Sequence, residues 1–245
     1  MKNQFGHNLL RSLYQIKPFV SLYAQNIGEV SSIIFSSKLN EEFLNFIPKG
    51  GKILEIGSGP GLQAMKIIQY RHDVEIIASD LSSEMIDYAK KKYQELILKG
   101  EYIKEVQSNL SFVQADVMDL SQFGDETFDG IYSLGAIKHF PNQIYALNEC
   151  IRILKPGGKM FFAEFLAEAS LPETINLVNH LKIPVFMKPI IARFLHNKHK
   201  KIVPGRADIE KWKNDLHSKG ITLSGYLQGY PFFILKFEKF LKTKN

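Results

Sequence analysis

The chain has 245 residues, 45% of them hydrophobic, which suits one globular domain, or one domain with an insertion, and supplies a sizeable core. No run approaches the ~18 consecutive apolar residues that a membrane-spanning helix needs. A single cysteine, Cys150, excludes an internal disulfide. The first residues lack the apolar core and cleavage site of a signal peptide, so we expect a cytoplasmic protein.

The first fifty residues are expected to be mostly helical. Apolar residues recur near helical spacing over residues 8–24, and a second helical pattern covers residues 29–47. Pro48-Lys49-Gly50-Gly51 then interrupts the chain before the first strand.

Strand and helix patterns alternate in the middle of the chain, which predicts a parallel sheet with helices on both faces. Strands are expected at 52–57, 74–79, 111–115, 128–134 and 159–165, and helices at 61–71, 83–98 and 142–153. A tight turn, Lys155-Pro156-Gly157-Gly158, is expected before the last of these strands.

The alternation ends at residue 165. Residues 166–206 interrupt it, and a helix is then expected over 208–219, with Gly220 at its end. Two strand-like segments, 221–227 and 232–240, complete the chain.

The segment 53–61, Ile-Leu-Glu-Ile-Gly-Ser-Gly-Pro-Gly, is the most informative motif. An apolar run ends in Gly57, Gly59 and Gly61, with Glu55 two residues ahead of the first glycine. Glycines let a backbone approach a ligand where a Cβ would clash. The next apolar run ends at Asp80, whose carboxylate can bridge both hydroxyls of a ribose. This layout at the carboxyl edge of a sheet indicates a nucleotide site.

The glycine spacing separates two kinds of nucleotide site. The dinucleotide fingerprint G-x-G-x-x-G would place its third glycine where this chain has Leu62. The pattern Glu55-x-Gly57-x-Gly59-x-Gly61 instead resembles motif I of the class I S-adenosylmethionine methyltransferases. The strand blocks around Asp80, Asp116, 128–133 and 154–163 follow in the order of that family, so the resemblance covers residues 50–165.

The resemblance implies an α/β fold with a doubly wound, mostly parallel, seven-stranded sheet and a C-terminal antiparallel hairpin. It also implies one methyltransferase domain over residues 1–245. Its expected parts are an N-terminal helical cap, a cofactor-binding core, a helical lid insertion, and a C-terminal helix with the hairpin, at residues 1–49, 50–165, 166–206 and 207–245.

The resemblance further implies how S-adenosyl-L-methionine would be held, with S-adenosyl-L-homocysteine as the product. Glu55 would face the ammonium group of the amino-acid tail, Asp80 would take the ribose hydroxyls, and Asp116 would read the adenine. The alternatives are a helix N-cap for Asp80 and an ordinary loop acid for Asp116. The expected cofactor-binding residues are Glu55, Gly57, Ser58, Gly59, Gly61, Asp80, Leu81, Met85, Ala115, Asp116, Val117 and Ser133.

One histidine is the candidate catalytic residue. His139 follows the fourth strand and should lie over the transferred methyl group, where a base is needed only if the acceptor starts protonated. A loop histidine that packs and hydrogen-bonds is the alternative, and the sequence leaves both open. His196 and His199 have metal-like spacing, but no carboxylate or cysteine accompanies them, so no metal site is expected.

The positive charge is concentrated in one segment. From Thr174 to Ala207 there is no acidic residue, whereas seven Lys and Arg residues lie there, more than the whole net charge of +6. Apolar residues lie among these cations, which suits an amphiphilic or anionic substrate or contact with an anionic membrane surface. A lid that packs its apolar face on the core is the plainer interpretation.

The favoured function is transfer of the methyl group of S-adenosylmethionine to a small-molecule or lipid-like acceptor by in-line displacement. An RNA or protein methyltransferase that docks through residues 174–207 is a second hypothesis. No Asn-Pro-Pro-Tyr or Asp-Pro-Pro-Tyr block follows the fourth strand, which weakens the nucleic-acid version. A non-catalytic S-adenosylmethionine-binding protein is a third, and the glycine spacing disfavours an NAD-dependent oxidoreductase. The methyl acceptor, the atom methylated and the oligomeric state stay open.

Overall fold

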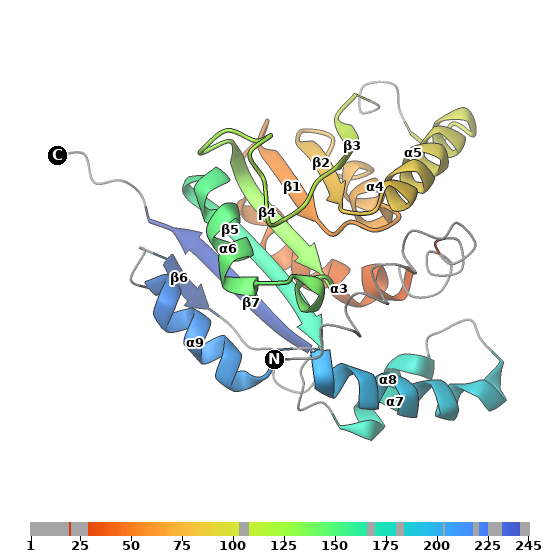
Figure 1. Cartoon of the computed structure of the whole chain (residues 1–245). Coiled ribbons are helices and arrows are strands. Elements are labelled where there is room, and N and C mark those ends of the chain that lie inside the picture. The colour runs from red at the N-terminus through yellow and green to blue at the C-terminus, as the bar shows by residue number, and fades with distance from the viewer. Residues whose placement is uncertain are drawn as a thin grey trace.

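A single sheet forms the centre of the molecule (Figure 1). The computed structural model describes residues 20, 29–102, 108–165, 170–179, 184–202, 204–217, 221–224 and 232–240. The strands are β1 (Lys52–Ile56), β2 (Glu75–Asp80), β3 (Leu110–Gln114), β4 (Phe128–Leu134), β5 (Leu154–Phe165), β6 (Ile221–Ser224) and β7 (Phe232–Lys239). Their order is β3-β2-β1-β4-β5-β7-β6. The first five pair in parallel, and β7 runs antiparallel to both β5 and β6.

Helices surround this sheet, and most of them pack on its two faces. They are α3 (Glu29–Glu42), α4 (Leu62–Ile68), α5 (Ser83–Leu98), α6 (Gln143–Ile153), α7 (Leu171–Asn179), α8 (Lys188–Ile202) and α9 (Arg206–His217), with short 3-10 turns η2 (Leu44–Phe46), η4 (Ile137–His139) and η5 (Val185–Met187). The expected mostly parallel α/β sheet with a C-terminal antiparallel pair is confirmed. Within the described residues, no helix is long and apolar enough to cross a membrane.

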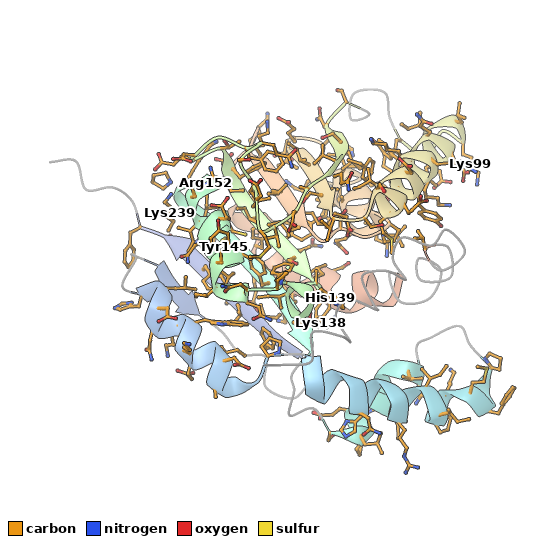
Figure 2. All side chains as sticks on the ribbon, viewed as in Figure 1. Lys99, Lys138, His139, Tyr145, Arg152 and Lys239 are labelled. Carbon is orange, nitrogen blue, oxygen red and sulfur yellow. The ribbon has the colours of Figure 1, made fainter. Side chains whose placement is uncertain are left out.

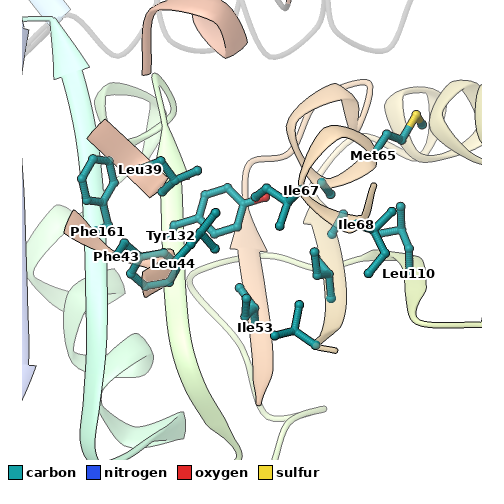
Figure 3. Packing of buried hydrophobic residues seen from close by; sticks show 14 of the residues in the cluster. Leu39, Phe43, Leu44, Ile53, Met65, Ile67, Ile68, Leu110, Tyr132 and Phe161 are labelled. Atoms are coloured by element: carbon teal, nitrogen blue, oxygen red, sulfur yellow. The ribbon is translucent and has the colours of Figure 1, made fainter. Parts of the chain in front are cut away.

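Alternating side chains of the strands feed two separate cores. On one face, Ile53 and Phe161 join residues of α3, α4 and α5, including Leu39 and Ile67, and also Phe43, which directly follows α3 (Figure 3). On the other face, apolar residues of the same strands join α6 and α9. Strand side chains point alternately to the two faces, so continuous apolar runs are what a doubly covered sheet requires. Cys150 is fully buried in the second core, as expected for a packing residue.

Local signals set the starts of two helices. The Ser82 hydroxyl accepts a hydrogen bond from the Met85 N–H at 3.1 Å and caps α5. The Asn142 side chain accepts one from the Tyr145 N–H at 3.2 Å and caps α6. Short polar side chains at these positions satisfy N–H groups that have no partner within the helix.

Three expectations differ from the structure. Residues 61–71 form the shorter helix α4, because Gly61 stands at its N-cap in the left-handed region and the chain turns after Gln69 toward β2. The pattern at 29–47 divides into α3 and η2. Of the strand expected over 221–227, β6 covers Ile221–Ser224, and residues 225–227 lie outside the described residues. Residues 8–24, apart from Val20, and the expected cap Gly220 lie outside the described residues.

The third difference is the place of the expected turn at residues 155–158, which lies inside β5 as an irregularity of the strand. Leu154 pairs with Phe128 and Lys159 pairs with Gly130, so four residues of β5 stand opposite one residue of β4. That one residue is Asp129, whose carboxylate accepts hydrogen bonds from the Lys155 ammonium and from the Lys52 N–H, both at 2.8 Å. The chain still turns there, with Gly157 at φ +75°, and the contact between Lys155 and Asp129 ties this turn to the sheet.

A buried ion pair connects β5 with the turn that follows β4. The Lys138 ammonium lies 2.9 Å from Oε1 of Glu164 and also donates to the Gly135 carbonyl. The Lys138 N–H donates to Oε2 of the same carboxylate at 3.4 Å. Glu164 is fully buried and Lys138 is 8% exposed. The pair thus fixes η4 against the end of the neighbouring strand.

Breaking this pair is expected to destabilise the protein strongly. Replacement of Lys138 by Met leaves the Glu164 carboxylate buried without its partner charge, which costs roughly 3–5 kcal/mol in comparable cases. The double variant Lys138→Met with Glu164→Leu should recover much of that loss, because no uncompensated charge remains. Urea unfolding of the two variants tests this, and equal destabilisation in both would contradict it.

Candidate functional site

A cavity opens where the order of the strands reverses. The chain proceeds from β1 outward through β2 and β3, then returns to the other side of β1 with β4, and the cavity lies at the carboxyl ends of these strands. Ligands bind outside the carboxyl ends of such sheets, at the point where the order reverses. The cavity holds about 820 Å³ of empty space, part of it open to solvent. It is lined by Ile56, Gly57, Gly59, Asp80, Leu81, Ser82, Met85, Ala115, Asp116, Val117, Leu134, Gly135, Ala136, His139, Phe140 and Pro141.

The loop after β1 needs glycines for two different reasons. Gly57, at φ +68°, faces the turn after β4, and a Cβ there would lie 2.4 Å from the Cβ of Ala136. Gly61, at φ +72°, packs α4 on the sheet, and its Cβ would lie 2.5 Å from the Phe112 ring. Real Cβ atoms do not approach so closely, and left-handed backbone disfavours other residues. Gly57 therefore shapes the cavity, whereas Gly61 permits helix packing beside it.

Asp80, at the end of β2, connects this loop to the start of α5. Its Oδ2 accepts a hydrogen bond from the Gly59 N–H, and its Oδ1 accepts one from the Ser82 N–H, both at 2.8 Å. Burial raises the pKa of this carboxyl, while the two N–H donors favour its ionised form. The helix cap itself is Ser82, so the alternative role of Asp80 as the N-cap does not hold. A carboxylate has about four acceptor positions, so Asp80 can still accept a hydrogen bond from a ligand hydroxyl.

Glu55 lies behind the glycine loop on β1. Its carboxyl is buried, 3% exposed, and one of its oxygens has no hydrogen-bond partner within the described residues. Desolvation raises its pKa to about 8; the neighbouring Tyr132 hydroxyl opposes that rise and the Asp80 charge adds to it. A buried carboxyl of this kind is stabilised in its charged form by a nearby cation. Glu55 does not itself line the cavity.

The segment after β3 forms the opposite wall. Ala115, Asp116 and Val117 line the cavity, and the Ala115 N–H is tied to the Asp80 carbonyl at 3.0 Å. Oδ1 of Asp116 accepts from the N–H of Met118 at 2.9 Å, which holds the carboxylate within its own turn. The second oxygen of Asp116 keeps its acceptor capacity, so it can receive a hydrogen bond from an amino group.

The turn after β4 closes the cavity. His139 ends η4 and lines the cavity with Phe140 and Pro141, while its neighbour Lys138 anchors the turn to Glu164. Figure 2 shows Lys138 and His139 together at the carboxyl end of the sheet. The ion pair therefore holds the backbone on which the imidazole stands.

These residues fit S-adenosylmethionine. The loop with its three glycines would approach the ligand, and the Asp80 carboxylate would take the two ribose hydroxyls. The apolar side chains of Leu81, Met85 and Val117 would suit the adenine, and the unsatisfied buried carboxyl oxygen of Glu55 would suit the ammonium group. The structure brings Gly57, Gly59, Asp80, Leu81, Met85, Ala115, Asp116, Val117 and His139 to the cavity. It places Glu55, Ser58, Gly61 and Ser133 around it but outside its lining.

Sequence reasoning missed part of the lining. Ile56, Ser82, Gly135, Ala136, Phe140 and Pro141 also border the cavity. Most of them belong to the turn after β4, and its Gly-x-x-x-x-Phe-Pro pattern carries no chemistry that would single them out. The residues of this turn are positioned by the ion pair between Lys138 and Glu164, which are 26 residues apart in the sequence.

The family comparison agrees with this geometry. Residues 54–162 match the family model described as a methyltransferase domain. An O-methyltransferase (rstn1) of Aspergillus nomiae is 31% identical over 124 residues, which is 51% of each chain. A ubiquinone/menaquinone biosynthesis C-methyltransferase, UbiE, of Rickettsia prowazekii is 32% identical over 144 residues, covering 57% of this chain and 54% of that protein. The chain thus spans about half the length of the curated relatives it matches.

Solved structures share the fold over most of the chain. A protein of Methanococcus maripaludis assigned as an S-adenosyl-L-methionine-dependent methyltransferase superposes with a TM-score of 0.66 at 22% identity, covering 93% of both chains. A SAM-dependent methyltransferase of Aquifex aeolicus gives a TM-score of 0.58 at 16% identity, over 86% of this chain and 96% of that one. At these identities the likeness concerns the fold.

Replacing Asp80 is expected to weaken S-adenosylmethionine binding. The variant Asp80→Asn keeps one oxygen acceptor but places an amide NH₂ against a backbone N–H. Hydrogen bonds to a charged group contribute about 1.5–3 kcal/mol, so the affinity for S-adenosylmethionine should fall roughly 10- to 100-fold. Isothermal titration calorimetry measures it. Glu75→Gln, at the exposed amino end of the same strand, is the matched control. If Asp80→Asn bound S-adenosylmethionine normally, the assignment of Asp80 to the cofactor site would be wrong.

Cofactor binding should also release a proton from Glu55. The folded-state pKa near 8 leaves the carboxyl mostly neutral at pH 7, and an adjacent ammonium would ionise it, so affinity should rise from pH 6 toward pH 8. Calorimetry in buffers of different ionisation enthalpy counts the protons.

Glu55→Gln should abolish that release and weaken binding. Because folding raises the pKa of Glu55 from 4.5 to about 8, this carboxyl lowers the stability of the fold progressively as the pH rises from about 4.5 to about 8. The variant should therefore melt a few degrees higher than the parent at pH 8.5, and by less at pH 5. Unchanged proton release in the variant would assign the proton to another group.

Proposed function

Because the chain carries a class I S-adenosylmethionine-dependent methyltransferase domain, we propose that it transfers a methyl group to a small-molecule or lipid-like acceptor bound beside His139. The observation that carries this proposal is the cavity itself. Gly57, Gly59 and Asp80 form one side, and the wall of His139, Phe140 and Pro141 faces them.

The lining favours a small, largely uncharged or apolar acceptor. Its charged members are Asp80 and Asp116, and among the described lining residues there is no Lys or Arg. A nucleic acid brings phosphates, which need cations close to the reacting group. The apolar side chains around the mouth, including Leu134, Phe140 and Pro141, instead suit an apolar molecule. RNA is therefore the weaker alternative at this cavity.

When bound, S-adenosylmethionine would supply a methyl group on a sulfonium, whose carbon–sulfur bond would break as the acceptor bonds to the methyl carbon, with S-adenosylhomocysteine as the leaving group. The residues of this chain contribute mainly position. Asp80 and the glycine loop fix one end of the ligand, and the turn held by Lys138 and Glu164 fixes the groups opposite. Holding two reactants in a productive geometry lowers the barrier by several kcal/mol.

His139 is proposed to accept the proton of the acceptor when that acceptor is a hydroxyl. The proton leaves the oxygen as the carbon–oxygen bond forms, and the imidazole receives it. The curated relatives include both O- and C-methyltransferases, so analysis of the methylated product must identify the acceptor atom.

The substrate class can be tested with methyl-labelled S-adenosylmethionine and an extract of the cells that make the protein. Label is expected in the organic or low-mass fraction, and Asp80→Asn should reduce it in parallel with its loss of cofactor affinity. Label recovered in RNA or protein would replace the proposed acceptor class. Cofactor binding without transfer to any fraction would favour a non-catalytic role.

Replacing His139 should separate its two possible roles. For His139→Gln we expect a kcat reduced roughly 100-fold or more, within the range of general-base catalysis, with unchanged affinity for S-adenosylmethionine. The acidic limb of the rate–pH profile should disappear as well. A variant that keeps that limb and loses only thermal stability would make His139 a packing residue.

A further inference from the structure

We propose that the α7–α8 pair, together with η5 between them, docks on the surface of an anionic lipid bilayer. The surface concerned, called here the docking tip, comprises residues 184–193. This inference concerns a second surface and stands apart from the identity of the methyl acceptor.

Exposed apolar side chains concentrate at the docking tip. Val185 is 79% exposed, Phe186 77% and Ile190 69%, and no residue of η5 is buried. Ten large apolar residues are exposed in the described part of the chain, and half of them lie between positions 175 and 190. Contiguous exposed apolar residues on a folded domain mark a surface that meets a partner or a membrane.

The two helices turn this apolar surface outward. Val178 of α7 and Ala192 of α8 are fully buried, and the two helices pack on each other. The exposed positions Ile190, Arg193 and Asn197 follow at spacings of three and four, so they share the outer face of α8. Lys188 donates to the Asn179 carbonyl at 2.8 Å, which fixes the end of α7 to the start of α8.

The pair stands away from the sheet. Figure 1 shows α7 and α8 together beyond the arrowheads of β4 and β5, outside the layers formed by the other helices. Although the sequence suggested a lid, the described residues of 166–206 do not line the cavity. The apolar side chains of the docking tip are therefore exposed rather than covering the cavity.

The charge around the docking tip identifies the partner. Arg193 is exposed one turn after Ile190, and from Thr174 to Ala207 the sequence contains seven cations and no acid. Apolar side chains that enter the boundary between headgroups and acyl chains, with cations beside them, are the combination that anionic lipids bind. Each Lys or Arg near such a surface adds roughly fivefold to the partition coefficient.

Two other partners fit less well. A second copy of the chain would bring two basic surfaces together, which repel one another. RNA would gain from the cations and could stack one base on the Phe186 ring, but Val185 and Ile190 offer neither charge nor a ring, so most of the exposed apolar surface would stay unused. Only a bilayer rewards the aliphatic side chains and the cations at the same time.

Sedimentation of the full chain with vesicles tests the proposal. Vesicles of phosphatidylcholine and phosphatidylglycerol in equal parts should bind the protein at least tenfold more tightly than pure phosphatidylcholine, and added salt should weaken binding. The double variant Phe186→Ser with Ile190→Ser should lose about tenfold, and Arg193→Gln less. Leu98→Ser, an 87% exposed residue on α5, is the matched control and should bind normally.

Three outcomes would overturn the proposal. They are no binding to either kind of vesicle, equal binding to both kinds, and full binding by the Phe186→Ser/Ile190→Ser variant. Tighter binding to single-stranded RNA than to the anionic vesicles, or a dimer in sedimentation that the double variant abolishes, would transfer the surface to those partners. All substituted residues are exposed, and S-adenosylmethionine binding by each variant reports a folded domain without depending on turnover.

Discussion

The carboxylate of Asp80 organises the edge of the sheet on which the site is built. One oxygen accepts the Gly59 N–H of the loop after β1, and the other accepts the Ser82 N–H at the start of α5. The loop and the helix are thus held by the same group that faces the cavity. The acceptor capacity that the carboxylate keeps suits a ligand with hydrogen-bond donors, and the hydroxyls of a ribose are such donors.

The rest of the site depends on a second fixed point across the cavity. The buried pair of Lys138 and Glu164 holds the turn after β4 against β5. The loop after β1 approaches that turn so closely that a Cβ on Gly57 would lie 2.4 Å from the Cβ of Ala136, and only glycine allows this approach. Buried ion pairs contribute little net stability but impose one arrangement. Here the ion pair fixes the position of His139 relative to the glycine loop.

The two surfaces discussed above differ in their electrostatics. The cavity is lined by acidic and apolar residues, whereas the segment around α8 is basic and apolar. A protein with this division can hold a cationic cofactor at one place and meet an anionic surface at another. The overall charge of +6 therefore says little about the reacting group, because the cations lie away from it.

The sequence alone determined the sheet, its helices and the cofactor class. The signals are local: apolar runs of strand length, the caps Ser82 and Asn142, and the glycine spacing from Gly57 to Gly61. Such signals depend only on residues that are close in the sequence, so they can be recognised without the structure. Only the tertiary structure decided which residues border the cavity. Gly61 packs against Phe112, Lys138 pairs with a residue 26 positions away, and the described residues of the insertion do not line the cavity. Those outcomes depend on contacts between distant segments, which no local pattern encodes.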